Sequence, residues 1–347
     1  MLLCTLSNRV ASCKCLDDWM CLSTPSTESV LLLLIRISTH RHANVRTRPY
    51  ELEIEVPESI SIASVGLDAS LTSAVQHIWD LDANRLRQGT DFVLNVQDGK
   101  KPFQRDDAAG DPLFTSVDER QYQTRPTYRA FLALLDNYIA ETGVAESVSD
   151  CERREVKVFL RAVMETAPMQ FCHKYCSANV ENVPSDKEAF IDLLHSIWFK
   201  PYGRSRGGRE DSSGFEHVFI GEVKDDKVSG FHNWIQLYQE EKRGALDYRG
   251  YIKPRGQNEA ATNDDDHILT LQFAWNGVEK AVGTSFMGSS PEFEMALYTT
   301  CYLVGGDENH VTLDTGVDVF ELNIRCYRMG SMQIGTSFPE AHSHYEE

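Results

Sequence analysis

The periodicity of apolar residues changes near Gly214, and this change constrains the fold more than any other feature. Between Ala69 and about Tyr202, apolar residues recur every three or four positions, which is the spacing of amphipathic helices. After Gly214 they alternate instead, which is typical of half-buried strands. The pattern predicts an α+β protein, with a helical N-terminal lobe at residues 69–212 followed by a β-rich lobe of antiparallel sheets at residues 213–347.

Local signals place several individual elements. Helices are expected around Leu71–Trp79, Phe131–Ile139, Glu152–Thr166, Met169–Ser177 and Lys187–Trp198, and strands at His267–Trp275, Val317–Tyr327 and Met332–Phe338. Ser185 or Asp186 would cap the helix at 187–198. Asn276-Gly277 is a hairpin-type turn, and Ser290-Pro291 starts a further helix with serine as its N-cap.

Residues 1–68 differ in composition from the rest and are expected to form an N-terminal extension, whose order stays open. Within them only Tyr50–Val56 alternates like a strand. The apolar run Val30–Ile35 stops at Arg36, far short of the ~20 residues of a membrane span. No convincing signal peptide precedes it, so we expect an intracellular protein without a membrane partner, while secretion stays open.

The nine cysteines show no regular disulfide framework. Cys172 and Cys176 would be neighbours one turn apart on a helix, but no second ligand pair at zinc spacing accompanies them. Buried, reduced thiols are therefore favoured over structural zinc. A separate hypothesis makes the Cys- and His-rich N-terminal segment a metal or partner module.

The net charge is −18, from 34 basic and 52 acidic residues, which argues against non-specific nucleic-acid binding. It does not exclude a site that grips one or two phosphates. The loop Lys200–Arg209 is cationic and rich in glycine. It is either an ordinary solvated loop or a lip that guides a phosphate toward the histidine that follows it.

Two histidines, His217 and His232, lie fifteen residues apart. In an alternating run, His217 would share a strand face with Gly221, which leaves space for a ligand. His232 is predicted in the first turn of a helix capped by Ser229, where the positive helix end keeps an imidazole neutral and attracts phosphate. Lys280 follows the Asn-Gly turn, either as a surface strand residue or as an ammonium that reaches a central cleft.

Two imidazoles and an ammonium are the groups that RNA cleavage by transesterification requires. One imidazole removes the ribose 2′-OH proton, the other protonates the departing 5′-oxygen, and the ammonium stabilises charge on the phosphate oxygens. The product would be a 2′,3′-cyclic phosphate. DNA lacks the 2′-OH and is expected to be inert.

Several motifs resemble the EndoU family of poly(U)-specific endoribonucleases, which is related to the coronavirus uridylate-specific endoribonuclease. They are Gly214-Phe-Glu-His-Val-Phe-Ile-Gly-Glu, Val228-Ser-Gly-Phe-His-Asn-Trp-Ile, Asp247-Tyr-Arg-Gly-Tyr-Ile, Val278-Glu-Lys-Ala-Val-Gly-Thr-Ser-Phe and Ser289-Ser-Pro-Glu-Phe-Glu-Met-Ala-Leu-Tyr. Further matches upstream, at Ile78-Trp-Asp-Leu-Asp-Ala-Asn-Arg-Leu, Asp111-Pro-Leu-Phe, Arg125-Pro-Thr-Tyr and Leu134-Leu-Asp-Asn-Tyr, extend the resemblance to roughly Ala69 to Phe338. It implies that the β-rich lobe is catalytic and that its substrate is single-stranded, uridine-containing RNA.

The resemblance also implies residue roles. His217 would be the acid, His232 the base and Lys280 the third catalytic group, while the acidic residues Glu216 and Glu222 would support them. Mn²⁺ would stimulate the enzyme from an unknown position.

The same resemblance makes Thr284 the hydroxyl that reads the edge of uracil, with Thr336 and Phe338 in the closing motif. Family members usually carry tyrosine at the position of Phe338. Phenylalanine can still stack on a base but lacks the hydroxyl, so we expect activity with softened base preference. The alternative is an RNA-binding module of the same fold with weak or lost catalysis. We expect a monomer in either case.

Overall fold

The computed structural model describes residues 69–341 with the exception of residues 103, 206–209, 253–266 and 331. The strand predicted at Tyr50–Val56 and the Cys/His-rich segment therefore lie outside the described residues. No helix in the described ranges combines the length and the apolar character that crossing a membrane requires.

The α-helices of the described residues are five to fifteen residues long. They are α1 (Leu71–Asp80), α2 (Glu119–Gln123), α3 (Pro126–Leu132), α4 (Asp150–Met164), α5 (Ala167–Asn179), α6 (Lys187–Trp198), α7 (Trp234–Lys242) and α8 (Pro291–Val304). The Asp186 carboxylate accepts the main-chain N–H of Ala189, so the cap predicted for α6 is confirmed. Ser290 likewise caps α8 through the N–H of Phe293.

One predicted helix is wrong in its extent. The apolar pattern at Phe131–Ile139 predicts a helix, but α3 ends at Leu132 and turns follow. Leu134 is fully buried and continues the apolar pattern without continuing the helix. Asp136 and Asn137 favour turns, and the Asn137 amide donates to Glu155 of α4, 3.0 Å away.

The strands form two larger sheets and two small ones. They are β1 (Phe92–Leu94), β2 (Gly99–Lys100), β3 (Phe114–Val117), β4 (Glu222–Lys224), β5 (Lys227–Ser229), β6 (Leu246–Ile252), β7 (Ile268–Trp275), β8 (Val278–Phe286), β9 (Glu308–Asp314), β10 (Val319–Met329) and β11 (Gln333–Ala341). One sheet has the order β2-β6-β7-β8 and the other β11-β10-β9, while β1 pairs with β3 and β4 with β5. All these pairings are antiparallel except β2 with β6.

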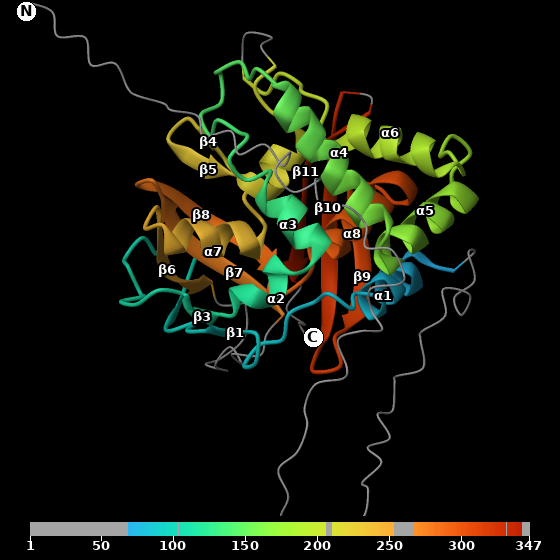
Figure 1. The fold of residues 1–347 in the computed structure, drawn as a ribbon. Coiled ribbons are helices and arrows are strands. Elements are labelled where there is room, and N and C mark those ends of the chain that lie inside the picture. Colours follow the sequence, from blue (N-terminus) through green and yellow to red (C-terminus); the bar gives the residue numbers. More distant parts are fainter. Residues whose placement is uncertain (1–68, 103, 206–209, 253–266, 331, 342–347) are drawn as a thin grey trace, which may run out of the picture. The chain divides into compact units, whose positions relative to one another are not determined.

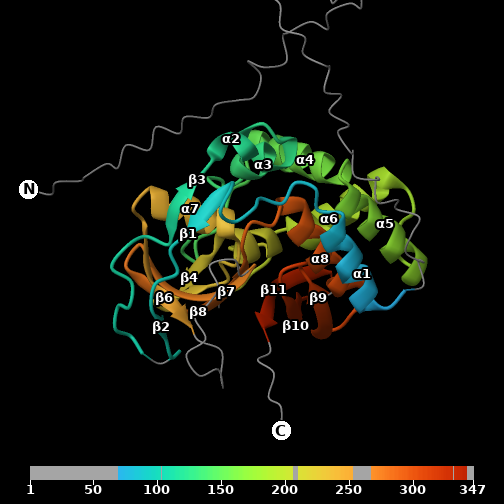
Figure 2. The same ribbon diagram turned by 90° about the horizontal axis from the view of Figure 1, so that it is seen from below.

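Helices α2 to α6 and the two larger sheets occupy different sides of the described domain (Figure 2), which confirms the α+β class. In Figure 2, α2 to α6 extend along one side, with β6–β8 and β9–β11 beneath them. Helix α8 lies between these layers, because it contacts α5 and α1 as well as β10 and β11 (Figure 1). Nearly all of its residues are buried. The boundary between lobes at residues 212 and 213 stays a prediction.

An aromatic cluster joins the helical layer to the segment that carries His217. Phe215 is fully buried and lies within 5.8 Å, between ring centroids, of Phe131, Phe159, Phe199 and Phe219. Residues of α3, α4 and the end of α6 thus pack around the segment that follows the cationic loop. The position of the segment around Phe215 is set by burial of aromatic surface, which is the largest stabilising contribution of such side chains.

Truncation of this cluster is expected to weaken the fold strongly. We predict that Phe215→Ala lowers the free energy of unfolding by about 3–5 kcal/mol, because it removes the central ring and leaves a cavity. Val158→Ala, at a position on α4 that is 47% exposed, is the control and is expected to change it by less than about 0.5 kcal/mol. Chemical denaturation measures both. A loss below about 1 kcal/mol for Phe215→Ala would contradict the cluster's role.

Candidate active site

His217 lies in a single π-helical turn, η2 (Glu216–Ile220), and the prediction of a strand at this position is wrong. All five residues of the turn are buried, so there is no exposed face to alternate with a buried one. Gly221 ends the turn with φ +97°, and a Cβ there would lie 2.6 Å from the ring of Phe231. Gly221 thus permits a close approach of its own segment to that of Phe231. The sequence had predicted a different role, in which Gly221 leaves open space for a ligand.

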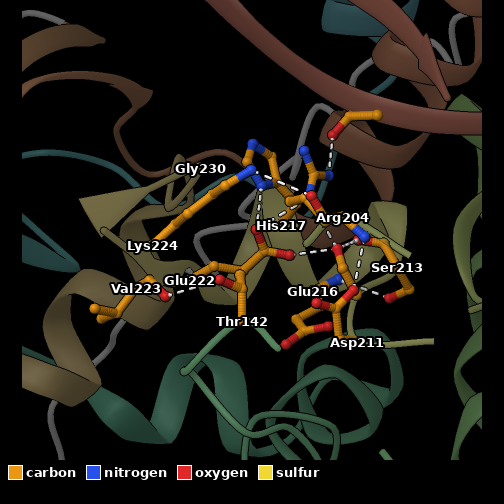
Figure 3. A network of polar contacts seen from close by, with 12 residues as sticks. Thr142, Arg204, Asp211, Ser213, Glu216, His217, Glu222, Val223, Lys224 and Gly230 are labelled. Carbon is orange, nitrogen blue, oxygen red and sulfur yellow. Dashed lines mark hydrogen bonds and ion pairs between the residues drawn. The ribbon is translucent and has the colours of Figure 1, made fainter. Parts of the chain in front are cut away.

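The imidazole of His217 is held by a buried carboxylate. Its Nδ1 lies 2.8 Å from Oε2 of Glu222, which follows the turn on β4 (Figure 3). Arg204 Nε lies 3.1 Å from the same carboxylate oxygen, and the Ser212 hydroxyl donates to the other oxygen. Because a carboxylate only accepts, Nδ1 of His217 carries the proton and Nε2 is the ring nitrogen left for a substrate.

Burial and charge act in opposite directions on this pair. Burial lowers the pKa of His217, and the adjacent Glu222 carboxylate opposes this without reversing it. Burial alone would raise the pKa of Glu222, but its bonds to His217, Arg204 and Ser212 hold that pKa below its usual value. Glu222 is therefore ionised at neutral pH and can stabilise an imidazolium whenever His217 gains a proton.

The segment Gly230–His232 is hydrogen-bonded to the turn that carries His217. The main-chain N–H of Phe231 donates to the oxygen of His217 at 2.9 Å, and that of His232 to the oxygen of Val218 at 2.8 Å. Gly230 (φ +65°) and Phe231 (φ +66°) both adopt left-handed backbone conformations. A Cβ on Gly230 would lie 1.8 Å from the oxygen of His217, so only glycine allows this contact.

His232 lies one residue before a helix cap, and its predicted place in the first turn after Ser229 is wrong. Ser229 ends β5, and α7 begins at Trp234. The N-cap is Asn233, whose side-chain oxygen accepts from two N–H groups of the first turn. Asparagine competes effectively for a cap, and the left-handed pair at 230–231 prevents the helix from starting earlier.

The ring of His232 is fixed on both sides. Its Nδ1 donates to the main-chain oxygen of Thr284, 2.9 Å away, and its face stacks on Phe338 with 4.8 Å between ring centroids. Burial lowers the pKa of His232 well below its usual value, and the charge of Lys280 lowers it further. Its free Nε2 is therefore an unprotonated acceptor near neutral pH. Burial is the main cause of the lowered pKa, and not the positive helix end that the sequence led us to expect.

Lys280 of β8 is buried and is not a surface strand residue. Its Nζ donates to the main-chain oxygen of Gly230 at 2.6 Å. Burial lowers its pKa from 10.5 to about 8. Gly283 leaves room for the lysine stem, because a Cβ there would lie 3.0 Å from Cε of Lys280. The amine therefore reaches the segment that joins the two histidines.

His217, His232 and Lys280 line one cavity of about 330 Å³. The other lining residues are Ser229, Gly230, Val282, Thr284, Thr336, Phe338 and Glu340. The Thr284 hydroxyl lies 3.0 Å from that of Thr270. Two imidazoles with different Nδ1 partners, an amine and an aromatic ring around one small cavity suit acid–base chemistry on a substrate with both a phosphate and a base.

Glu216 does not line this cavity. Its carboxyl group is buried, and neither oxygen has a hydrogen-bond partner among the described residues. Burial raises the pKa of Glu216 to about 10, with further contributions from Glu146 and Glu222. The carboxyl group of Glu216 is therefore a neutral acid at pH 7, and it lies outside the cavity lining, where it interacts with the Glu222 carboxylate.

Comparison with known proteins decides the family. A family model described as Endoribonuclease XendoU matches residues 70–339. The chain belongs to this family. A poly(U)-specific endoribonuclease of Xenopus tropicalis is 41% identical over 281 residues, which is 79% of this chain and 94% of that protein. A uridylate-specific endoribonuclease of Homo sapiens is 43% identical over 237 residues, 67% of this chain and 55% of that protein.

The fold is shared as well. The solved structure of XendoU, described as a splicing-independent snoRNA-processing endoribonuclease, superimposes with a TM-score of 0.69. It is 39% identical in sequence and covers 82% of this chain and 100% of its own. The matched residues 70–339 agree with the range of roughly Ala69 to Phe338 that the motif resemblance predicts, which confirms that resemblance.

Within this XendoU-family site, Arg204 is a residue whose role the sequence did not predict. The cationic loop suggested a solvated segment or a phosphate-guiding lip. Instead, the Arg204 guanidinium is mostly buried against Glu222 and donates to the main-chain oxygen of Gly335. The buried Ser212 is a second such residue. No sequence pattern pairs either one with Glu222, because both lie before the motif that ends at Glu222 and the contacts form only in the folded chain. Residues 206–209 of the loop lie outside the described ranges.

The described residues contain no group of three or more His, Cys, Asp or Glu side chains that could hold a metal ion. Cys172 and Cys176 lie one turn apart on α5 with 4.0 Å between sulfurs, and both are buried. No ligands for Mn²⁺ can therefore be assigned from the described part of this XendoU-family chain.

The buried environment of Lys280 gives a direct prediction. We expect its amine to titrate at about 8 in the folded protein, because burial disfavours the charged form. It is an ammonium below that pH and loses its charge as the pH rises through 8. NMR titration of ¹³C-labelled lysines measures this, with the exposed Lys242 as internal control. Titration of Lys280 above pH 10 would contradict the burial of its amine.

Proposed function

We propose that this protein is an endoribonuclease that cleaves single-stranded RNA, preferentially at uridines. The cut would proceed by attack of the ribose 2′-OH and leave 2′,3′-cyclic phosphate ends. The observation that carries the proposal is the shared cavity, in which His217 and His232 are both anchored through Nδ1 and Lys280 lies between their segments. The relatives from Xenopus tropicalis and Homo sapiens are named as poly(U)-specific and uridylate-specific endoribonucleases, which supports uridine as the preferred base.

His232 suits the role of general base. Its ring is neutral and Nε2 is unprotonated, so it can accept the proton of the ribose 2′-OH. The resulting oxygen attacks phosphorus, and the P–O5′ bond breaks. Stacking on Phe338 and the bond to Thr284 hold the ring in one orientation, which lowers the entropy cost of reaching the reactive geometry.

His217 suits the role of general acid, because Glu222 stabilises its protonated form. Burial keeps the free ring neutral, but a phosphate that enters the cavity adds negative charge and favours the imidazolium. Its Nε2–H would then protonate the departing 5′-oxygen. Each proton transfer is typically worth ~10²–10⁴ in rate.

Lys280 would bind the non-bridging phosphate oxygens as charge grows on them. A preorganised charge donor of this kind contributes ~10²–10³. The hydroxyls of Thr284 and Thr336 and the ring of Phe338 would receive the uracil base, and Glu216 and Glu222 would support the acid from behind. Phe338 keeps a stacking surface but brings no hydroxyl to that contact.

The resemblance to the family leads us to propose also that Mn²⁺ stimulates the reaction. No step above passes through the ion, because the described residues supply no ligand group for it. The proposal further includes action as a monomer.

Removal of the proposed base tests the assignment. We expect His232→Ala to reduce cleavage of a uridine-containing oligonucleotide by ~10²–10⁴ while the thermal unfolding midpoint changes little. His195→Ala, at an exposed position on α6 outside the cavity, is the matched control and should cleave like the wild type. Near-normal cleavage by His232→Ala would remove the assignment. A wild-type protein that binds the RNA but cleaves no faster than His232→Ala would favour the non-catalytic RNA-binding module.

A further inference from the structure

The cavity has two distinct ends, one beside His217 and one beside His232, which the contacts along β8 and β11 identify. On β8, the amine of Lys280 donates to the main-chain oxygen of Gly230, which lies beside His217. The main-chain oxygen of Thr284 accepts from His232. On β11, Gly335 accepts from Arg204, the partner of Glu222 at the His217 end. The two strands contact each other and both run from the acid end toward the base end of the cavity.

Further along β11, Phe338 stacks on His232, and Glu340 follows two residues later on the same strand face. Two residues of strand span roughly 7 Å. Glu340 therefore lines the cavity beyond His232, at the end opposite His217 and Lys280.

A bound nucleotide would follow the same direction, which makes this inference rest on the proposed function. The scissile phosphate must lie between Lys280 and the two imidazoles, and the 2′-OH must meet His232. The base is attached to the ribose carbon next to the one that bears the 2′-OH, on the side away from the leaving group. The uracil of the cleaved nucleotide would therefore extend toward Glu340.

Arg325 fixes the Glu340 carboxylate. Its Nε lies 2.7 Å from Oε2 of Glu340, and its Nη1 pairs with Glu308 on β9. The guanidinium of Arg325 offsets the negative charge that Glu340 brings to a site for RNA. No other described residue donates to Oε1 of Glu340, so this oxygen stays open to a ligand donor.

We propose that Glu340 reads the Watson–Crick edge of the uridine base, with its carboxylate accepting the hydrogen bond from uracil N3–H. A carboxylate is acceptor-only, and N3–H is the only donor on the edge of uracil. The hydroxyls of Thr284 and Thr336 can donate to the carbonyl oxygens of the base. Cytosine presents a lone pair at N3, which a carboxylate repels, so Glu340 discriminates between the two pyrimidines.

The experiment uses DNA oligonucleotides that contain one ribonucleotide: uridine, cytidine or N3-methyluridine. The wild type should cleave uridine about tenfold faster than N3-methyluridine, because the methyl group removes the donor. Glu340→Gln should reduce the ratio of uridine to cytidine cleavage about tenfold, because an amide can also donate to cytosine N3.

Glu308→Gln is the matched control, since it removes the other carboxylate on Arg325 and leaves the cavity lining intact. Its uridine-to-cytidine ratio should equal that of the wild type. An unchanged ratio in Glu340→Gln, an equal fall in Glu308→Gln, or equal cleavage of uridine and N3-methyluridine by the wild type would each overturn the inference. The methylated substrate needs no variant, so it tests the inference even if Glu340→Gln fails to fold.

These outcomes are distinguishable from failure of the proposed function. A wild-type protein that cleaves none of the three strands contradicts the endoribonuclease itself. A wild type that cleaves uridine while Glu340→Gln keeps the same base preference overturns only the role of Glu340.

Discussion

Two main-chain hydrogen bonds, from Phe231 to His217 and from His232 to Val218, hold the candidate site together. They join the π-helical turn to the segment before α7, so the positions of the two imidazoles depend on one shared contact. The contact requires a residue without Cβ at position 230, which is Gly230. The main-chain oxygen of Gly230 also accepts a hydrogen bond from the amine of Lys280. Three groups from distant parts of the sequence are thereby positioned by a backbone contact, and the aromatic cluster around Phe215 sets the turn against the helices.

Burial and neighbouring charges together set the protonation states of the groups around the site. Glu222 is ionised because Arg204, Ser212 and His217 bind it. The Glu216 carboxyl has no hydrogen-bond partner among the described residues and is a neutral acid. Burial makes His232 neutral and brings the pKa of Lys280 close to physiological pH. The two histidines are chemically alike in sequence. Their different partners at Nδ1, a carboxylate and a main-chain oxygen, are what distinguish the proposed acid from the proposed base.

Sequence reasoning predicted the elements whose signals are local. Asp186 and Ser290 cap their helices as expected, and Asn276-Gly277 joins β7 to β8, because capping and turn formation depend on nearby residues. It failed at His217, since a turn buried on every side carries no periodicity, and at Ser229, since the left-handed conformation of Phe231 is not visible in its residue type. Arg204 and Glu340 were missed because tertiary contacts bring Arg204 to Glu222 and Glu340 to the cavity.

The proposed cleavage mechanism depends on the ribose 2′-OH as the nucleophile. Its most direct test is the end chemistry of a DNA oligonucleotide that contains one ribouridine, analysed by mass spectrometry after cleavage. The account predicts a single cut on the 3′ side of the uridine, with a 2′,3′-cyclic phosphate on one fragment and a 5′-hydroxyl on the other. A 3′-hydroxyl with a 5′-phosphate, or equal cleavage of the all-DNA strand, would contradict it.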